Sequence, residues 1–284
     1  MSQLLEDIGV CPATLLSDPL DCPPAIFEAL LDAVSSAGDS RLSVWTFHAA
    51  RSGVERTEQL LADRGLRAGA VEAALAWTRG ASVANRAEAE RLVETAVHLG
   101  AGVVVAVNLE SELSAGPATE GLAELGRMVG EAGLRLAVEF LPWSGIPTLA
   151  VANDLVVASE SPAAGILIDC WHWQRQPGGP DLDLLRSLPG DRITYVQLCD
   201  AGPVPQADTY GEAMSARRLP GDGVVDLSAL VEALDEIGAR PFVASEVFSA
   251  ELVALGPDVA ARRIHDACAA LRDRLTSLPG TPDA

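Results

Sequence analysis

The sequence has little positive charge and no long apolar run, and each shortage excludes a class of protein. It carries 20 lysine and arginine residues against 40 aspartate and glutamate residues, a net charge of −20. Such a surface repels a phosphate backbone, so we expect no nucleic-acid partner. No stretch approaches the roughly 18 consecutive apolar residues of a membrane span, and the first residues show no basic segment followed by an apolar one. We therefore expect no membrane partner and a cytoplasmic protein.

Cysteines are also few. The five residues form no C-x-x-C pair, and their number is odd. A small secreted domain held by disulfides carries an even number of cysteines, so this pattern indicates reduced thiols. The five are Cys11, Cys22, Cys170, Cys199 and Cys268.

Hydrophobic residues make up 49% of the chain, and they form apolar strand-like runs that alternate with amphipathic stretches. This alternation is typical of repeated βα units around a parallel sheet. We expect strands over residues 8–16, 42–48, 66–74, 103–108, 134–140, 166–168, 193–198 and 242–247. The clearest helices are expected over residues 24–37, 85–99, 120–132, 147–159, 182–188, 227–237 and 258–275. Eight units in 284 residues predict an α/β fold, a single (β/α)₈ TIM barrel, for which about 250 residues is typical.

No change in composition marks a second domain. We expect one barrel domain over residues 1–276 and a short disordered tail over residues 277–284. The segment over residues 201–223 is rich in glycine, proline and charge and is too long to be a plain connection. We therefore expect it to act as a lid or a binding loop.

Polar residues end several of the expected strands. The stretch G-I-L-I-D-C-W-H-W-Q over residues 165–174 begins as an apolar strand and reaches Asp169 and His172 where that strand ends. In a parallel barrel the carboxyl ends of all strands meet at one mouth, where ligands bind. The other polar residues at strand ends are His48, Asn108, Glu139, Gln197 and Glu246.

Four of these residues come from four successive strands: Glu139, Asp169, Gln197 and Glu246. A single acid near a strand end is more often an exposed rim residue, but four on neighbouring strands favour a shared site. Three carboxylates in one mouth would repel each other unless a cation lies among them. An all-oxygen set suits Mg²⁺ or Mn²⁺ better than Zn²⁺, so we expect one divalent ion, Mg²⁺ or Mn²⁺.

The second half of the chain resembles a known family. The motifs are V-E-F with Glu139, D-x-x-H from Asp169 to His172, V-Q-L-C-D-A-G-P around Gln197, R-x-x-P-G-x-G from Arg217, and S-E-V with Glu246. Together they resemble the xylose isomerase-like sugar isomerase and epimerase superfamily, and within it they are most similar to hydroxypyruvate isomerase. The resemblance covers roughly residues 134–250. Most of the superfamily has histidine where this chain has Gln197, whereas hydroxypyruvate isomerase-like members use glutamine.

The resemblance implies a function. Glu139, Asp169, Gln197 and Glu246 would hold the metal, and Glu139 and Glu246 would also serve as catalytic acid and base. One glutamate takes a proton from the carbon beside a carbonyl and the other returns it at the next carbon, through an enediolate. His172 would donate to the substrate oxygen and Arg217 would hold a substrate group, with His48 and Asn108 as further substrate-binding candidates.

These motifs leave alternatives open. The expected function is isomerisation or epimerisation of a small hydroxy-carbonyl compound, a sugar, keto-sugar or hydroxy-acid. A lyase or dehydratase needs the same metal and base, so it remains the alternative enzyme. A DNA repair endonuclease of the superfamily uses several zinc ions and many histidines; this chain has four histidines and a net charge of −20, so this alternative is set aside. An alternative outside the enzymes is a non-catalytic subunit that keeps the barrel and binds a partner. Homo-oligomers are common in the superfamily, and the sequence leaves the oligomeric state open.

Overall fold

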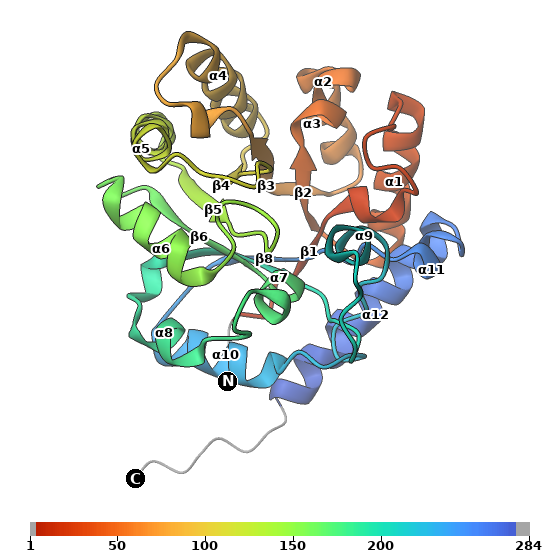
Figure 1. The fold of residues 1–284 in the computed structure, drawn as a ribbon. Helices are drawn as coiled ribbons and strands as arrows, with labels where there is room; N and C mark the ends of the chain where they lie inside the picture. The colour runs from red at the N-terminus through yellow and green to blue at the C-terminus, as the bar shows by residue number, and fades with distance from the viewer. Residues whose placement is uncertain (1–3, 277–284) are drawn as a thin grey trace.

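The computed structural model describes residues 4–276, which form a closed barrel of eight parallel strands in the order of the chain. Figure 1 shows the helices arranged around these strands. The predicted single TIM barrel is confirmed, and the predicted tail over residues 277–284 lies outside the described residues. The strands are β1 (Gly9–Val10), β2 (Arg41–Trp45), β3 (Arg67–Ala74), β4 (Val103–Val107), β5 (Arg135–Glu139), β6 (Ala164–Asp169), β7 (Ile193–Leu198) and β8 (Phe242–Ser245).

Helices connect each strand to the next. In the part of the chain that the structure describes, no helix is long and apolar enough to cross a membrane. The α-helices are α1 (Pro24–Ala37), α2 (Thr46–Ser52), α3 (Val54–Asp63), α4 (Val83–His98), α5 (Ala115–Glu131), α6 (Leu149–Ala158), α7 (Cys170–Arg175), α8 (Leu182–Ser187), α9 (Thr209–Ser215), α10 (Leu227–Glu236), α11 (Ala250–Val253) and α12 (Pro257–Thr276). Short 3₁₀ helices are η1 (Pro12–Leu15), η2 (Trp77–Arg79) and η3 (Gly190–Arg192).

The first strand is much shorter than the sequence pattern predicts. The expected strand over residues 8–16 was wrong beyond Val10, because η1 begins at Pro12. Proline has no N–H for the strand ladder and is well tolerated at the start of a helix. Two residues still suffice to close the barrel, since Val10 pairs with Leu42 of β2 and with Ser245 of β8.

The second strand also ends earlier than expected, at Trp45 in place of His48. The run Val44–Trp45–Thr46–Phe47 has high strand propensity, but helix α2 already begins at Thr46. Tertiary packing overrides propensity here. His48 therefore lies on α2 and not at a strand end. The sequence also gave no clear indication of α3, the second helix that follows this strand.

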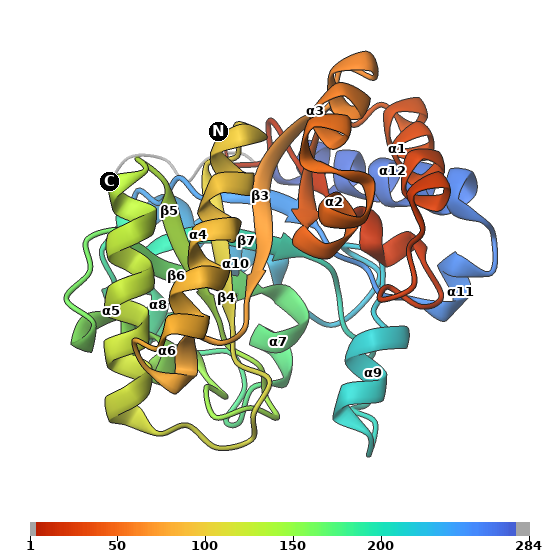
Figure 2. The same cartoon turned by 90° about the horizontal axis from the view of Figure 1, so that it is seen from above.

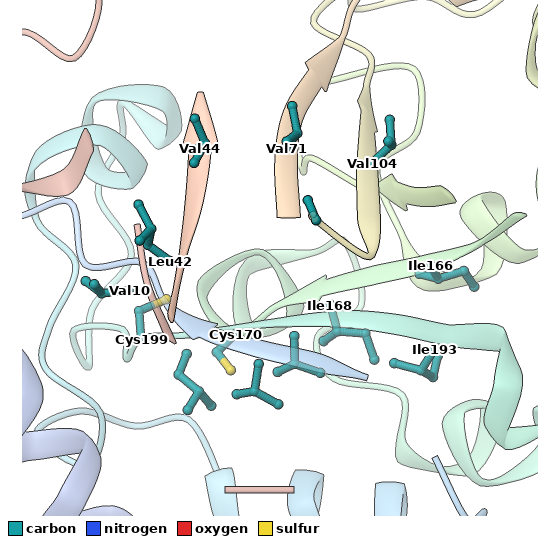
Figure 3. Packing of buried hydrophobic residues seen from close by; sticks show 14 of the residues in the cluster. Val10, Leu42, Val44, Val71, Val104, Ile166, Ile168, Cys170, Ile193 and Cys199 are labelled. Carbon is teal, nitrogen blue, oxygen red and sulfur yellow. The ribbon is translucent and has the colours of Figure 1, made fainter. Parts of the chain in front are cut away.

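Side chains of the strands fill two separate cores. The outward-facing side chains pack against the helices, and Figure 3 shows Val44, Val71, Val104 and Ile166 among them. The inward-facing side chains form a second cluster inside the barrel, which includes Ala70, Ala137, Leu167, Tyr195 and Phe242. Because side chains alternate along a strand, the residue two positions after each inner member again points inward.

The amino end of the barrel is closed by Phe242. A Cβ atom at Gly69 would overlap the Phe242 ring, so only glycine leaves room for it there. The guanidinium of Arg41 lies over the same ring, 4.7 Å from its centroid. Tyr195 packs on the inner side, with a distance of 4.9 Å between ring centroids. The barrel interior is therefore filled from below, and polar groups inside it lie near the carboxyl ends of the strands.

Candidate active site

The structure brings the four predicted ligands into one buried mouth. Glu139 ends β5, Asp169 ends β6, Gln197 lies on β7, and Glu246 directly follows β8. The exposed fraction of each residue is at most 7%. Asp169 and Gln197 are neighbours in strand register, and the Gln197 Nε2 atom donates to Glu246 Oε1 at 3.1 Å. These residues are far apart in the sequence, and they lie close together because their strands are neighbours in the barrel.

Arg217 joins two of these carboxylates. Its Nη1 atom donates to Asp169 Oδ2 at 2.6 Å and to Glu246 Oε2 at 3.2 Å. The same atom donates to the backbone oxygen of Glu246, and Nε donates to the backbone oxygen of Ala213. Arg217 is 3% exposed, so this ion pair network is shielded from water. Arg217 therefore lies among the predicted ligands, and the prediction that it holds a substrate group stays a prediction.

His172 is placed by the strand end itself. Asp169 caps helix α7, because Oδ1 accepts a hydrogen bond from the His172 backbone N–H at 2.9 Å. The His172 Nε2 atom lies 3.3 Å from Glu139 Oε1, and the Nδ1 atom has no hydrogen-bond partner. Burial lowers the pKa of His172 to about 4, so the imidazole is neutral at pH 7. A neutral ring can donate one proton or offer one lone pair.

The acids of the mouth are hard to ionise together. Burial, together with the charge of Asp169, raises the pKa of Glu139 to about 8. Burial raises the pKa of Glu246 well above its usual range, although Arg217 acts in the opposite direction. Such shifts mean that ionisation of these carboxyl groups is unfavourable, because the site excludes water and holds too little positive charge. A further cation would remove this cost.

The residues present fit a divalent metal. Glu139, Asp169 and His172 each offer a ligand atom within 4.8 Å of the others. The Gln197 Oε1 atom is buried and has no partner, which leaves a carbonyl oxygen free to coordinate. The carboxylate and amide oxygens suit Mg²⁺ and Mn²⁺, whereas the His172 nitrogen also suits Zn²⁺, and Glu246 lies outside this close group. Two of the predicted ligands, Asp169 and Glu246, also hold Arg217, so a bound ion would share them with the guanidinium.

The sequence prediction missed a fourth acidic residue of the mouth. Glu72 lies on β3, is 6% exposed, and accepts a hydrogen bond from the Tyr195 hydroxyl at 3.2 Å. Burial raises the pKa of Glu72 to about 7, and the charge of Glu139 contributes to the shift. The signal was an acid two positions after Ala70 in an apolar strand. It was hidden because apolar residues, Val71 and Ala73, stand on both sides of it.

Two predicted substrate-binding residues make other contacts in this structure. His48 is buried on α2, where its Nε2 atom lies 2.8 Å from the Pro19 backbone oxygen. Asn108 follows β4 and closes a turn with Glu110, because its side-chain amide bonds both the N–H and the C=O of that residue. Their contact with a substrate stays a prediction.

Aromatic side chains surround the charged groups. The Arg217 guanidinium lies over the rings of Trp171 and Phe248, at 6.0 Å and 5.1 Å from their centroids. Trp143 contacts His172 edge to face at 5.3 Å between centroids, and Tyr210 of α9 at 5.5 Å. These rings limit the access of water and strengthen the electrostatic interactions inside the mouth.

The segment predicted as a lid contains α9, which protrudes beyond the body of the molecule in Figure 2. Asp200 fixes the end of this segment to the barrel. The Asp200 carboxylate accepts hydrogen bonds from four backbone N–H groups, those of Ala201, Gly221, Gly223 and Val225. A Cβ atom at Gly223 would overlap this carboxylate, which explains the second glycine of the P-G-x-G sequence. The loop that carries Arg217 is thereby fixed to the end of β7.

Helix α9 is also bound to α7. The Glu212 Oε1 atom accepts hydrogen bonds from the Arg175 guanidinium and from the Trp171 indole N–H. The Arg175–Glu212 ion pair is nearly buried, with 7% and 3% of the two side chains exposed. Because Arg217 Nε is bonded to the α9 backbone, this pair connects the position of Arg217 to the helix that begins at Asp169.

Comparison with known proteins supplies independent findings. The family model for the xylose isomerase-like TIM barrel matches residues 31–273. A 3-dehydroshikimate dehydratase from Pseudomonas putida is 29% identical over 169 residues, which cover 58% of this chain and 26% of that protein. An inosose isomerase from Bacillus licheniformis is 28% identical over 179 residues, which cover 60% of this chain and 63% of that protein. The chain thus spans less than two thirds of either relative.

Solved structures share the fold. An IOLI protein superimposes with a TM-score of 0.79 and 20% identity, covering 96% of this chain and 100% of that one. A fusion protein of a xylose isomerase-like TIM barrel and a 4-hydroxyphenylpyruvate dioxygenase gives a TM-score of 0.78 and 21% identity, covering 98% of this chain and 45% of that one. At this level of identity, the likeness extends to the architecture alone.

Proposed function

Because this chain belongs to the xylose isomerase-like TIM barrel family, we propose that it is a divalent-metal-dependent isomerase or epimerase of a small hydroxy-carbonyl compound. The observation that carries the proposal is the convergence of Glu139, Asp169, Gln197 and Glu246 in one buried mouth. Inosose isomerases among the relatives support a ring-shaped polyhydroxy ketone as the substrate class. The closer resemblance to hydroxypyruvate isomerase, the oligomeric state and the cytoplasmic location stay predictions.

In this proposal the two glutamates move the proton. Glu139 lies on β5 and Glu246 follows β8, so the two carboxylates approach a bound substrate from different strands. One takes the proton from the carbon beside the carbonyl, and the other, already protonated, donates its own proton at the adjacent carbon, so the two glutamates exchange protonation states. The pKa of Glu139, raised to about 8, suits this task, because a base with a pKa near the working pH can be both deprotonated and reprotonated, and burial raises the pKa of Glu246 in the same direction.

Other residues orient the substrate and the ligands. Glu139, Asp169, Gln197 and Glu246 would hold the metal, which when bound polarises the substrate carbonyl and acidifies the neighbouring C–H. His172, neutral and 3.3 Å from Glu139, would donate to the substrate oxygen. Arg217 keeps Asp169 and Glu246 in place. The sequence contains no lysine, so a lysine Schiff base is not an available route.

A dehydratase is the second candidate. The observation in its favour is the 3-dehydroshikimate dehydratase relative, 29% identical over 169 residues. Removal of a proton beside a carbonyl followed by loss of a β-hydroxyl group requires the same base and the same carbonyl polarisation. The two reactions differ in the product: an isomer in one case, and an unsaturated ring plus water in the other.

The test begins with the metal. Elemental analysis of the purified protein before and after EDTA treatment, followed by addition of Mg²⁺, Mn²⁺ or Zn²⁺, should show about one ion per chain. Zinc is included because the IOLI protein was solved with a zinc atom. A ligand at 100 times its Kd stabilises the folded state by about 2.7 kcal/mol, so the melting temperature should rise by roughly 5 to 10 °C.

The metal-loaded protein is then incubated with inosose or with 3-dehydroshikimate in D₂O and followed by NMR. Deuterium at the carbon beside the carbonyl together with an isomeric product supports the isomerase. Loss of water from 3-dehydroshikimate supports the dehydratase. Absence of metal binding and of turnover would contradict both and favour a non-catalytic barrel.

A further inference from the structure

Glu72 is placed to contact whatever binds in the mouth. Ala70 belongs to the cluster inside the barrel, so Glu72, two residues later on β3, points to the same interior. It pairs in register with Trp45 of β2, on the side of the barrel away from β6 and β7. The proposed metal ligands come from β5 to β8. Glu72 therefore approaches a substrate from the opposite wall.

Among the described residues, the Glu72 carboxylate faces two hydroxyl groups, those of Tyr195 and Ser43, and no basic group. The Tyr195 hydroxyl donates to Oε1 at 3.2 Å, and Tyr195 itself is fully buried on the Phe242 ring. Neither Arg217 nor His172, the basic groups of the mouth, pairs with Glu72. The other carboxylates of the mouth are bonded to these two groups or to Gln197. A carboxylate has about four acceptor positions, so Glu72 can accept a further hydrogen bond from a ligand.

The charge balance of the mouth restricts that ligand. Four carboxylates face it, from Glu72, Glu139, Asp169 and Glu246, against the single guanidinium of Arg217. Even a divalent ion would not neutralise four ionised acids. The Arg217 guanidinium already donates to Asp169, Glu246 and Ala213. A carboxylate on a substrate would find no unengaged guanidinium there, and a hydroxyl group would find an acceptor.

We propose, building on the proposed function, that Glu72 is a substrate-binding residue that selects an uncharged, hydroxyl-rich ring over a carboxylated one. Glu72 accepts a hydrogen bond from a ring hydroxyl, and Tyr195 keeps the carboxylate oriented toward it. Hydrogen bonds to a charged acceptor are stronger than those between neutral groups, so this contact contributes to affinity as well as to selection. Of the two candidate reactions, this role of Glu72 favours isomerisation of an uncharged polyhydroxy ring over dehydration of a carboxylated one.

Binding of unreactive ligands tests the proposal without turnover. Calorimetry on the metal-loaded protein compares inositol, an uncharged ring polyol, with shikimate, a carboxylated ring. The wild type should bind inositol at least tenfold more tightly than shikimate. Glu72→Gln should weaken inositol binding about tenfold and strengthen shikimate binding. Tyr195→Phe, which keeps the carboxylate and removes its hydrogen bond, should weaken inositol binding by a smaller factor.

Glu90→Gln is the matched control, since it removes one negative charge from the exposed face of α4 and should leave both affinities unchanged. Equal affinities in wild type and Glu72→Gln would overturn the role of Glu72, and so would a wild type that prefers shikimate. Either result leaves the metal enzyme itself intact. Failure of the wild type to bind metal would instead contradict the proposed function.

Discussion

At the scale of single residues, Glu246 has two functions that substitution can separate. Its carboxylate accepts hydrogen bonds from Gln197 and Arg217, and in the proposed mechanism it also transfers a proton. A glutamine at this position keeps the volume and one acceptor oxygen but cannot act as a base. The residue is thus the most direct test of the mechanism.

Glu246→Gln should lower kcat at least 100-fold, because general acid–base catalysis contributes 10²- to 10⁴-fold. The melting temperature of the metal-free variant should equal or exceed that of the wild type, since burial disfavours the ionised form of Glu246. Steady-state kinetics and thermal melting check the two statements. A variant with wild-type activity would remove Glu246 from the proton transfer.

Gln197→His tests the metal site. The free Oε1 atom of Gln197 would be replaced by an imidazole nitrogen, which suits Zn²⁺ and Co²⁺ better than Mg²⁺. Metal content should remain about one ion per chain, and the preference should shift toward these softer ions. Competition between Mg²⁺ and Zn²⁺, followed by elemental analysis, measures the shift. An unchanged preference would mean that Gln197 is not a ligand.

Residue patterns predicted part of this mouth. Glu139, Asp169 and Glu246 could be found because each stands where an apolar strand ends, and Arg217 because it begins a glycine-containing motif. Glu72 could not be found in this way, because it lies inside its strand and no change of pattern marks it. The contacts of Arg217 with Asp169 and Glu246 depend on the closed barrel and leave no trace in the local sequence.

At the scale of elements, α9 is attached through one nearly buried ion pair. Glu212 accepts hydrogen bonds from Arg175, from Trp171 and, through Oε2, from the backbone N–H of Gln206. Removal of one partner leaves the other charge buried without compensation, which costs several kcal/mol. The loop over residues 201–223 depends on this contact for its position.

Glu212→Ala should therefore make the loop sensitive to protease and raise KM, because Arg217 is bonded to the α9 backbone. The expected loss of stability is about 3 to 5 kcal/mol if the whole barrel responds. Limited proteolysis and urea unfolding measure the two effects. The double variant Arg175→Met with Glu212→Leu removes both charges and should recover most of the stability. Cleavage outside the loop would contradict this account.

The order of the elements was predictable, and some of their ends were not. Continuous apolar runs such as Val103–Val107 identify strands that are buried on both faces. The length of strand β1 was predicted wrongly because this two-residue strand is defined by its pairing with Leu42 and Ser245. That pairing cannot be seen in the local sequence. Strand β2 was expected to reach His48 because Thr46 and Phe47 favour strands wherever local propensity alone decides.

At the scale of the whole molecule, the acidic residues fall into two groups, those on the surface and those buried in the mouth. The chain carries a net charge of −20, and four carboxylates of the mouth lie buried in addition to the acids on the surface. Salt screens the acids on the surface, and it screens the buried acids much less. The stability of the metal-free protein should therefore depend on pH through the buried acids.

The pKa of Glu72 is raised from 4.5 to about 7, so the folded state binds a proton more tightly than the unfolded chain does. Its contribution to stability is complete below about pH 4.5 and is lost as the pH rises through about 7. The loss amounts to at most about 3 kcal/mol. Urea unfolding of the EDTA-treated protein should show stability falling over this range.

Glu72→Gln should reduce that fall, and Glu90→Gln should not change it. A metal-free protein whose stability is the same at pH 5 and pH 7.5 would contradict the raised pKa values of Glu72 and Glu139. The metal-loaded protein is expected to show a smaller dependence, since a bound cation favours the ionised carboxylates.

The closed amino end of the barrel has an isotopic consequence. Phe242 and Tyr195 fill the interior below the carboxylates, so bulk water reaches Glu139 and Glu246 only from the side on which the substrate binds. A bound substrate therefore blocks hydrogen exchange between a protonated glutamate and bulk water. In the two-glutamate mechanism the hydrogen that enters the product comes from the second glutamate, which exchanged with D₂O before the substrate entered, so each turnover should incorporate one deuterium.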